Sequence, residues 1–257
     1  MSAAVSLAPD AGPPWLRPLL DNVDGVRDAY RRRASPQILA AISAASDEAK
    51  QSGARRDAAV LVLFSGPASE PGDGGLATEA RLLVTVRAST LRHHAGQAAF
   101  PGGASDPGDD GPVGTALREA WEETGIDTAR VRPLATLHRM FIPPSGFHVV
   151  PVLAYAPDPG PVAVIDEAET ALVSHVPVRA FTNPENRLMV YRSANTRASA
   201  GPAFLLNEML VWGFTGQVIS AMLDVAGWAK PWDDSKVVEL HDAMAMVPTD
   251  NGGPKQL

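Results

Sequence analysis

Three glutamates lie close together in the segment REAWEETG, residues 118–125. On an α-helix, Glu119, Glu122 and Glu123 would stand at positions i, i+3 and i+4 and would therefore share one face. Carboxylates at this spacing repel one another by roughly 0.2–0.5 kcal/mol per pair unless a positive charge lies between them. Arg118 can reach Glu122 at i, i+4, but one cation does not neutralise three carboxylates. A divalent metal ion would do so; the alternative is a solvated helical face, the usual role of such charge runs.

The segment directly before the glutamates is suited to supplying further oxygen ligands. Gly102 and Gly103 follow a proline, and such a backbone can fold tightly and present bare carbonyl and amide groups. Asp106, Asp109 and Asp110 then lead into the expected helix. A hard cation such as Mg²⁺ takes octahedral oxygen ligands from carboxylates, backbone carbonyls, water and substrate phosphates. A loop carbonyl that faces a carboxylate-bearing helix provides this set.

The segment from Gly103 to Ile126 resembles the Nudix box, whose usual form is G-x5-E-x7-R-E-U-x-E-E-x-G-U, with U aliphatic. The second half of the box matches at Arg118, Glu119, Ala120, Glu122, Glu123, Gly125 and Ile126. The first half departs from it in two ways. Between Gly103 and Arg118 there is one residue more than the box allows, and the loop acid is Asp110 instead of glutamate.

The longer loop, with its DPxD segment at 106–109, resembles the coenzyme A pyrophosphatase branch of the Nudix hydrolases. The upstream pattern of that branch, L-L-T-x-R-S-x3-R-x3-G-x3-F-P-G-G, falls on Leu83, Val84, Thr85, Arg87, Ala88, Arg92, Gly96 and Phe100 to Gly103. Every spacing agrees, and the mismatches are Val84 for leucine and Ala88 for serine. SGFHVVPV (145–152) and VWGFTG (211–216) also look like segments of this branch, so the resemblance covers roughly residues 80–217.

The resemblance implies a metal and catalytic set. Its members are Arg118, Glu119, Glu122 and Glu123 together with the carbonyl of Gly102, and the implied cofactor is Mg²⁺ or Mn²⁺. One of the carboxylates or a loop acid activates water, and we favour Glu119. Glu169 is a candidate for a further ligand or base, or else an exposed glutamate in the acidic run DEAET.

The resemblance also implies a substrate-binding set: Arg87, Arg92, His94 and Gly103. Coenzyme A carries a 3′-phosphate besides its pyrophosphate, and arginine is suited to bidentate phosphate recognition, so either arginine could bind the 3′-phosphate. We expect His93 to face solvent. Trp121 and Trp212 are expected to pack in the core, as aromatic residues on apolar helices usually do.

Composition limits the classes of function. With 257 residues, of which 45% are apolar and 20% charged, the chain can bury a sizeable core in one domain or at most two. A net charge of −7 argues against nucleic-acid or anionic-membrane binding. The absence of cysteine excludes disulfides, thiolate zinc sites and cysteine nucleophiles. The N-terminal residues lack the pattern of a signal peptide, and no apolar run is long enough to span a membrane, so we expect a cytoplasmic location.

The pattern of elements predicts what must position these residues. Strands are expected at 58–64, 81–88, 135–141, 147–156, 171–178 and 187–193, the first two forming a hairpin; helices are expected at 35–51, 113–124 and about 207–228. Strands and helices are interspersed without a regular βαβ rhythm, which favours an α+β fold with a mixed sheet packed between helices. The resemblance implies that this fold is a Nudix-type α/β/α sandwich. We expect a partly loose extension at 1–34, a single Nudix hydrolase domain at 35–228 and a tail at 229–257.

The expected function is metal-dependent hydrolysis of the pyrophosphate bond of coenzyme A or its derivatives, giving 3′,5′-ADP and 4′-phosphopantetheine or its acyl form. Its partner would be a small nucleotide-like molecule, and the sequence leaves open whether the protein is a homodimer. Two alternatives remain. One is a Nudix pyrophosphatase acting on NADH, ADP-ribose or a nucleotide sugar, against which the upstream signature argues. The other is a ligand-sensing domain without turnover, against which the three retained carboxylates argue.

Overall fold

The computed structural model describes residues 6–32, 36–51, 56–69, 75–90, 96–143, 145–192 and 200–247. Its larger sheet contains β1 (Arg56–Ser65), β2 (Arg81–Arg87), β3 (Ala98–Ala99), β4 (Gly102–Ala104), β5 (Arg132–Thr136), β6 (Met140–Ile142), β7 (Phe147–Ala156) and β8 (Thr170–Pro177). The smaller sheet contains β9 (Arg187–Tyr191), β10 (Gly201–Leu206), β11 (Met209–Val211) and β12 (Val237–Glu239). The α-helices are α1 (Arg17–Leu20), α2 (Gly25–Arg32), α3 (Pro36–Gln51), α4 (Gly111–Thr124), α5 (Val178–Thr182), α6 (Gly213–Val225) and α7 (Leu240–Ala245). Short 3₁₀ turns are η1 (Pro9–Ala11), η2 (Pro14–Leu16), η3 (Thr128–Arg130) and η4 (Pro184–Asn186).

The larger sheet is mixed. Its central order is β3-β2-β1-β7-β5, while β4 pairs with β1, β6 with β7 and β8 with β2. β1 and β7 are parallel along their whole length, from Arg56 opposite Phe147 to Ser65 opposite Ala156. The remaining pairs of this sheet are antiparallel, including the predicted hairpin of β1 and β2, in which Phe64 faces Leu82. The parallel pair brings the carboxyl ends of β1 and β7 to one edge of the sheet.

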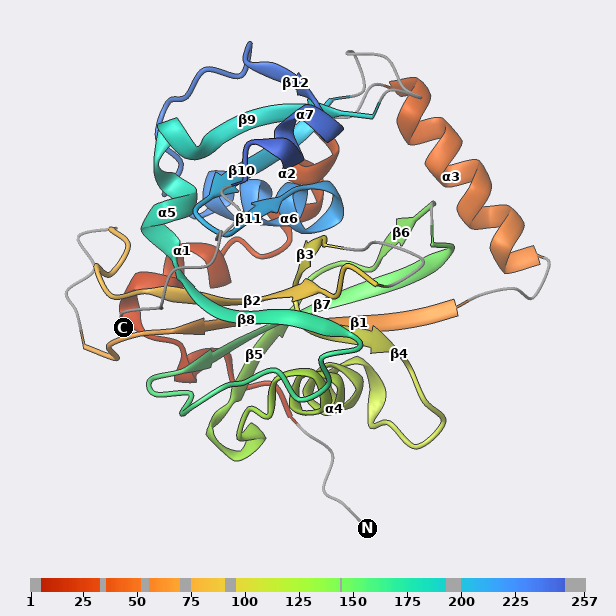
Figure 1. Ribbon diagram of the computed structural model, residues 1–257. Coiled ribbons are helices and arrows are strands. Elements are labelled where there is room, and N and C mark those ends of the chain that lie inside the picture. The colour runs from red at the N-terminus through yellow and green to blue at the C-terminus, as the bar shows by residue number, and fades with distance from the viewer. Residues whose placement is uncertain are drawn as a thin grey trace.

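Helices cover both faces of this sheet, as Figure 1 shows. Alternate residues of β1 point to opposite faces, because side chains in a strand alternate. Leu61 and Leu63 pack with Ala116 and Ala120 of α4, while Val62 and Phe64 join the core that α1, α2 and α6 cover from the other side. This α/β/α arrangement confirms the predicted α+β fold class.

The smaller sheet packs on the core that α1, α2 and α6 cover. Its order is β11-β10-β9-β12, and Phe204 and Val211 turn toward the side of α6. On its other face, Ala203 and Leu210 pack with Ala243 of α7. The N-terminal residues also reach this part of the molecule, since the side chain of Trp15 is buried in the core that includes α6.

The strand predicted at 135–141 is two strands, and the prediction of one continuous strand is wrong. β5 and β6 both pair with β7, but residues 137–139 between them lie outside the ladder. Thr136 faces Val152 and Met140 faces Val149, so one extra residue is accommodated between the two pairs. β7 carries Pro151 at this point, and proline has no N–H to donate to a neighbouring strand.

The helix predicted to begin near Asn207 begins at Gly213, so the prediction is wrong for its first residues. Asn207 and Glu208 instead form the turn of a hairpin in which Leu206 of β10 faces Met209 of β11. Gly213 has φ +63°, a left-handed conformation that a continuous right-handed helix does not accommodate. α6 ends at Val225, three residues before the predicted end, and Val211, the first residue of the predicted apolar stripe, lies in β11.

The predicted helix at 35–51 corresponds to α3, although Ser35, its expected N-cap, lies outside the described residues. α3 lies at the margin of the larger sheet beside β6 (Figure 1), where Ser46 Oγ and His148 Nε2 form a hydrogen bond of 3.0 Å. Across the described parts of the chain, no helix has both the length and the apolar character needed to cross a membrane.

Candidate functional site

The two glycines of β4 bring its backbone against α4. Gly102 pairs with Val60, and a Cβ on Gly102 would lie 2.4 Å from the carbonyl oxygen of Ala59. A Cβ on Gly103 would lie 2.5 Å from the Cδ of Glu119. Backbone atoms exclude a side chain at Gly102, whereas a side chain at Gly103 would displace the carboxyl group of Glu119. One glycine lets the loop lie against the sheet, and the other lets a helix carboxylate lie against the loop.

Two box glutamates face this loop. The backbone N–H of Gly102 donates a hydrogen bond of 3.3 Å to Glu123 Oε2. The pKa of Glu123 is raised to about 7, chiefly by burial and also by the charge of Glu119. The hydrogen bond from Gly102 and the charge of Arg87 act in the opposite direction. Burial also raises the pKa of Glu119, against the lowering effect of Arg118. A solvated helical face, the alternative for this carboxylate cluster, does not describe these two largely buried side chains.

Arg118 ties the loop to the helix. Its guanidinium makes two ion-pair hydrogen bonds to Asp109, from Nε at 2.8 Å and from NH2 at 2.9 Å, and NH2 also donates to the carbonyl of Ala104 at 3.0 Å. Its NH1 donates to Glu119 at 2.9 Å and to Glu122 at 3.0 Å, the second being the predicted i, i+4 contact. Glu122 is the most exposed of the three box glutamates.

Asp109 is the site residue that sequence reasoning did not single out. Its hydrogen bonds with Arg118, together with those from Thr115 and the backbone of Asp106, hold the pKa of Asp109 well below its usual range. The side chain is only 7% exposed. Three aspartates within the loop offered the same charge, and the spacing alone did not show which one turns toward the helix.

The end of β2 and the start of β8 form the other side of the site. Arg87 pairs with Thr170, and the N–H of Ala88 donates to the carbonyl of Glu169 at 2.8 Å. Arg87 and Glu169 both act electrostatically on Glu123, with opposite effects on its pKa. The structure thus gathers Arg87, Glu169 and Glu123 around one region, although the side chain of Glu169 is exposed.

Arg87 also closes the base of the loop that follows it. Its N–H donates to the carbonyl of Gln97 at 3.1 Å, and its carbonyl accepts from Gly96 at 3.0 Å. Arg92, His93 and His94, which the sequence analysis assigned to substrate or solvent, lie outside the described residues.

The three box carboxylates do not meet at one point in the described structure. The carboxylate oxygens of Glu119, Glu122 and Glu123 are not all within 4.8 Å of one another. Among the described residues, the group that meets this distance is Glu239, His241 and Asp242, in which only Glu239 is partly buried. Arg118 binds two of the box carboxylates, and Gly102 binds the third.

The two tryptophans differ. Trp121 was predicted to pack in the core, and this is wrong: it is 58% exposed. The buried side of α4 is formed by Val113, Ala116 and Ala120, and the next residue turns about 100° away from it. Trp212 is partly buried and packs against the cluster on the outer face of the smaller sheet.

A family model for the NUDIX domain matches residues 69–193. A protein of Photorhabdus laumondii named "Uncharacterized Nudix hydrolase NudL" is 35% identical over 138 residues, which span 54% of this chain and 73% of the relative. A protein of the same name from Yersinia pestis is 44% identical over 145 residues, spanning 55% of this chain and 70% of the relative. The chain belongs to the Nudix hydrolase family. Among solved structures, a Nudix hydrolase of M. smegmatis, RenU, aligns with 23% identity and a TM-score of 0.38 over 49% of this chain and 72% of that one.

Nudix hydrolases act on small nucleotide molecules with the help of divalent metal ions. The donor set suits a hard cation, because carboxylates from α4 meet the backbone of β4 at Gly102 and Gly103. The raised pKa of Glu123 also favours a cation at this site, because a nearby positive charge would stabilise the ionised form of a buried carboxylate. Glu119, Glu122 and Glu123 could therefore hold such an ion, with Arg118 fixing the orientation of two of them.

Proposed function

We propose that this Nudix hydrolase is a coenzyme A pyrophosphatase that uses Mg²⁺ or Mn²⁺ to give 3′,5′-ADP and 4′-phosphopantetheine or its acyl form. The observation that supports it is the upstream signature from Leu83 to Gly103, in register with the box. In the fold, β2 and β3 carry this signature directly into β4, whose glycines contact the helix glutamates. Substrate recognition and hydrolysis would then share one continuous stretch of chain.

In this proposal Glu119, Glu122, Glu123 and the carbonyl of Gly102 are the metal ligands, and Glu169 is a further ligand or base. The bound ion would neutralise phosphate charge and lower the pKa of a coordinated water. Glu119 is our candidate for the general base, since it lies against the loop at Gly103. Arg118 is a positioning residue that keeps Glu119 and Glu122 oriented while anchoring the loop through Asp109.

Arg87, Arg92, His94 and Gly103 are the proposed substrate-binding residues. Arg87 lies close enough to Glu123 to lower its pKa, so its guanidinium belongs to the charge environment of the carboxylates. A guanidinium in this position suits the pyrophosphate, whose oxygens must lie at the same carboxylates for hydrolysis. That leaves Arg92 as the signature arginine for the 3′-phosphate of coenzyme A.

The deciding experiment is incubation of the purified protein with Mg²⁺ or Mn²⁺ and coenzyme A, followed by chromatography of the products. We expect 3′,5′-ADP, and none when a chelator replaces the metal. NADH and ADP-ribose should be tested in parallel at the same concentration. Cleavage of either of these with no 3′,5′-ADP from coenzyme A would reject the coenzyme A assignment and favour the alternative pyrophosphatase.

A further inference from the structure

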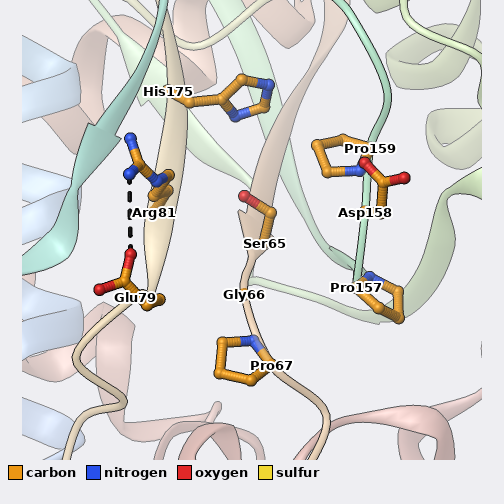
Figure 2. A pocket seen from close by; sticks show the side chains of 9 residues that line it. All are labelled: Ser65, Gly66, Pro67, Glu79, Arg81, Pro157, Asp158, Pro159 and His175. Carbon is orange, nitrogen blue, oxygen red and sulfur yellow. Dashed lines mark ion pairs between the residues drawn. The ribbon is translucent and has the colours of Figure 1, made fainter.

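A hollow of about 440 Å³ opens at the edge where β1 and β7 end (Figure 2). It is lined by Ser65 at the end of β1, Gly66 and Pro67 after it, Glu79 before β2, Arg81 at the start of β2, residues 157–159 after β7, and His175 of β8. β4, whose glycines contact the box glutamates, pairs with β1 nearer the start of that strand, where Gly102 faces Val60. At about 3.3 Å per residue, Val60 and Ser65 are about 17 Å apart along the strand. The hollow is therefore separate from the box carboxylates.

The register of the sheet places three polar side chains of the hollow on one face. Ser65 faces Arg81 directly across β1 and β2. Because Leu83 faces His175, this histidine is the diagonal neighbour of Arg81 on the same face, within reach of a long side chain. Figure 2 shows the three side chains around one opening, opposite the Pro157–Pro159 segment. A single small ligand could contact all three.

Among the described residues, His175 has no hydrogen-bond partner. Both of its ring nitrogens are buried and bond to no described residue. Burial, and secondarily the charge of Arg81, lower the pKa of His175, so at neutral pH the ring offers one N–H donor and one acceptor. A buried polar group without a partner is destabilising, and a bound group that supplied one would relieve this cost. Rotation about χ2, which is broad in histidine, would turn one nitrogen toward a bound group.

The guanidinium of Arg81 is only loosely held. Its NH2 lies 3.8 Å from Glu79 Oε2, and the two side chains are 47% and 61% exposed. An ion pair this exposed contributes little to stability, so Arg81 can exchange Glu79 for a ligand oxyanion. The other carboxylate of the hollow, Asp158, is already paired with Arg130 at 3.0 Å and accepts from the N–H of Gly160 at 3.0 Å.

Bonds from the core fix the wall of the hollow after β1. The hydroxyl of Tyr155 donates to the carbonyl of Gly66 at 2.7 Å, and the indole N–H of Trp15 donates to the carbonyl of Pro67 at 2.9 Å. Three of the lining residues are prolines, Pro67, Pro157 and Pro159, whose rings are apolar and rigid. A volume of about 440 Å³ is within the range of small-molecule sites, so the hollow can hold an organic group beside the anion.

We propose that this hollow binds a small organic oxyanion, a phosphate monoester or a carboxylate. Arg81 holds its charge, Ser65 and His175 donate hydrogen bonds, and the proline rings contact its organic part. The site is distinct from the hydrolytic centre and does not depend on which pyrophosphate the enzyme cleaves.

The proposal can be tested with metal-free protein carrying ¹⁵N-labelled histidine. The imidazole resonances of its six histidines are followed by NMR, and that of His175 is assigned from the His175→Gln variant. AMP, inorganic phosphate and acetate are titrated separately at constant ionic strength, so that the three series distinguish a phosphate monoester, the bare anion and a carboxylate. We expect a saturable shift of the His175 resonance with at least one of them.

Two variants complete the test. Arg81→Gln removes the proposed anion-binding group and should raise the dissociation constant about tenfold or more. Arg17→Gln is the matched control, because Arg17 is also a partly exposed arginine in a loose ion pair, with Asp10 at 3.3 Å, and does not line the hollow; it should leave the titration unchanged. The proposal is overturned if the His175 resonance does not shift with any of the three ligands up to about 10 mM. A dissociation constant above that concentration corresponds to a binding free energy too small for a built site. It is equally overturned if Arg81→Gln shifts as the wild type does.

Discussion

At the scale of single residues, the two glycines of β4 and the two buried glutamates depend on each other. Gly103 has no side chain where the carboxyl group of Glu119 lies, and Gly102 donates its N–H to Glu123. Burial raises the pKa of both glutamates, while the hydrogen bond from Gly102 lowers that of Glu123. Burial thus makes the carboxylates costly to ionise, and a bound cation relieves that cost.

Arg87 provides a test at the same scale. Because its charge acts on Glu123, we expect Arg87→Ala to reduce kcat/KM for coenzyme A and for 3′-dephospho-coenzyme A equally, by about 1.5–3 kcal/mol of transition-state stabilisation. Arg92→Ala should instead lower kcat/KM more for coenzyme A than for 3′-dephospho-coenzyme A, so that the ratio of the two values decreases. Steady-state kinetics with both substrates measures this difference. A selective loss in the Arg87 variant would reverse the roles that we assign to the two arginines.

At the scale of elements, side chains of α4 depend for their position on the segment that precedes the helix. Two of the contacts between α4 and the segment before it can be tested separately: Gly103 against Glu119, and Asp109 against Arg118. The first contact is steric and the second is electrostatic. Each can be altered without changing a proposed metal ligand.

The steric contact is tested by Gly103→Ala. The added Cβ would lie 2.5 Å from the Cδ of Glu119, so the carboxyl group must move. Since a misplacement of about 1 Å can cost about 100-fold in rate, we expect kcat to fall at least tenfold. Gly108→Ala, in the same loop with nothing within 4 Å of its Cβ, is the control and should retain normal kcat. Similar rates for the two variants would show that the position of Glu119 tolerates the change.

The electrostatic contact is tested by Asp109→Asn. Loss of the charged hydrogen bonds to Arg118 should lower the free energy of unfolding by about 1.5–3 kcal/mol at pH 7. Because the pKa of Asp109 is depressed in the fold, this contribution is present above the unfolded value of about 4 and is lost as the pH falls below it. Urea unfolding at several pH values should show the difference between wild type and variant shrinking in acid.

The control for this experiment is Asp127→Asn. Asp127 pairs with Arg130 at 3.3 Å, but both side chains are about half exposed, so removal of this pair should cost less than about 1 kcal/mol. If both aspartates gave the same small loss, Asp109 would be an ordinary surface partner and not the anchor of the loop.

The scale of the whole molecule shows what could be predicted from sequence and what could not. The box helix and its C-cap at Gly125 were predictable because periodicity and glycine are local signals. The exposure of Trp121 was not, since it depends on which face of α4 the sheet covers. The hairpin at Asn207 was also missed, because apolar residues at helical spacing also fit a short buried strand. The choice of Asp109 as the partner of Arg118 depends on how the loop folds, which its composition does not determine.

Replacement of a box glutamate should affect the stability of the fold and the activity of the enzyme differently. Glu123→Gln keeps the shape of a side chain that is costly to ionise in its buried position and removes its charge. We expect turnover to fall by about 100-fold or more, a loss of about 2.7 kcal/mol, while the metal-free variant melts at the same temperature as the wild type or higher.

Metal binding then separates the two proteins in one melting experiment. An ion that binds only the folded state stabilises it by mass action, so Mg²⁺ or Mn²⁺ should raise the melting temperature of the wild type. The increase should be smaller in Glu123→Gln, because one of the proposed ligands has lost its charge. Thermal melts with and without about 5 mM metal, together with a turnover assay, measure both effects. Normal turnover in the variant, or a marked loss of its metal-free stability, would make Glu123 a structural residue and return the carboxylate cluster to the role of an ordinary helical surface.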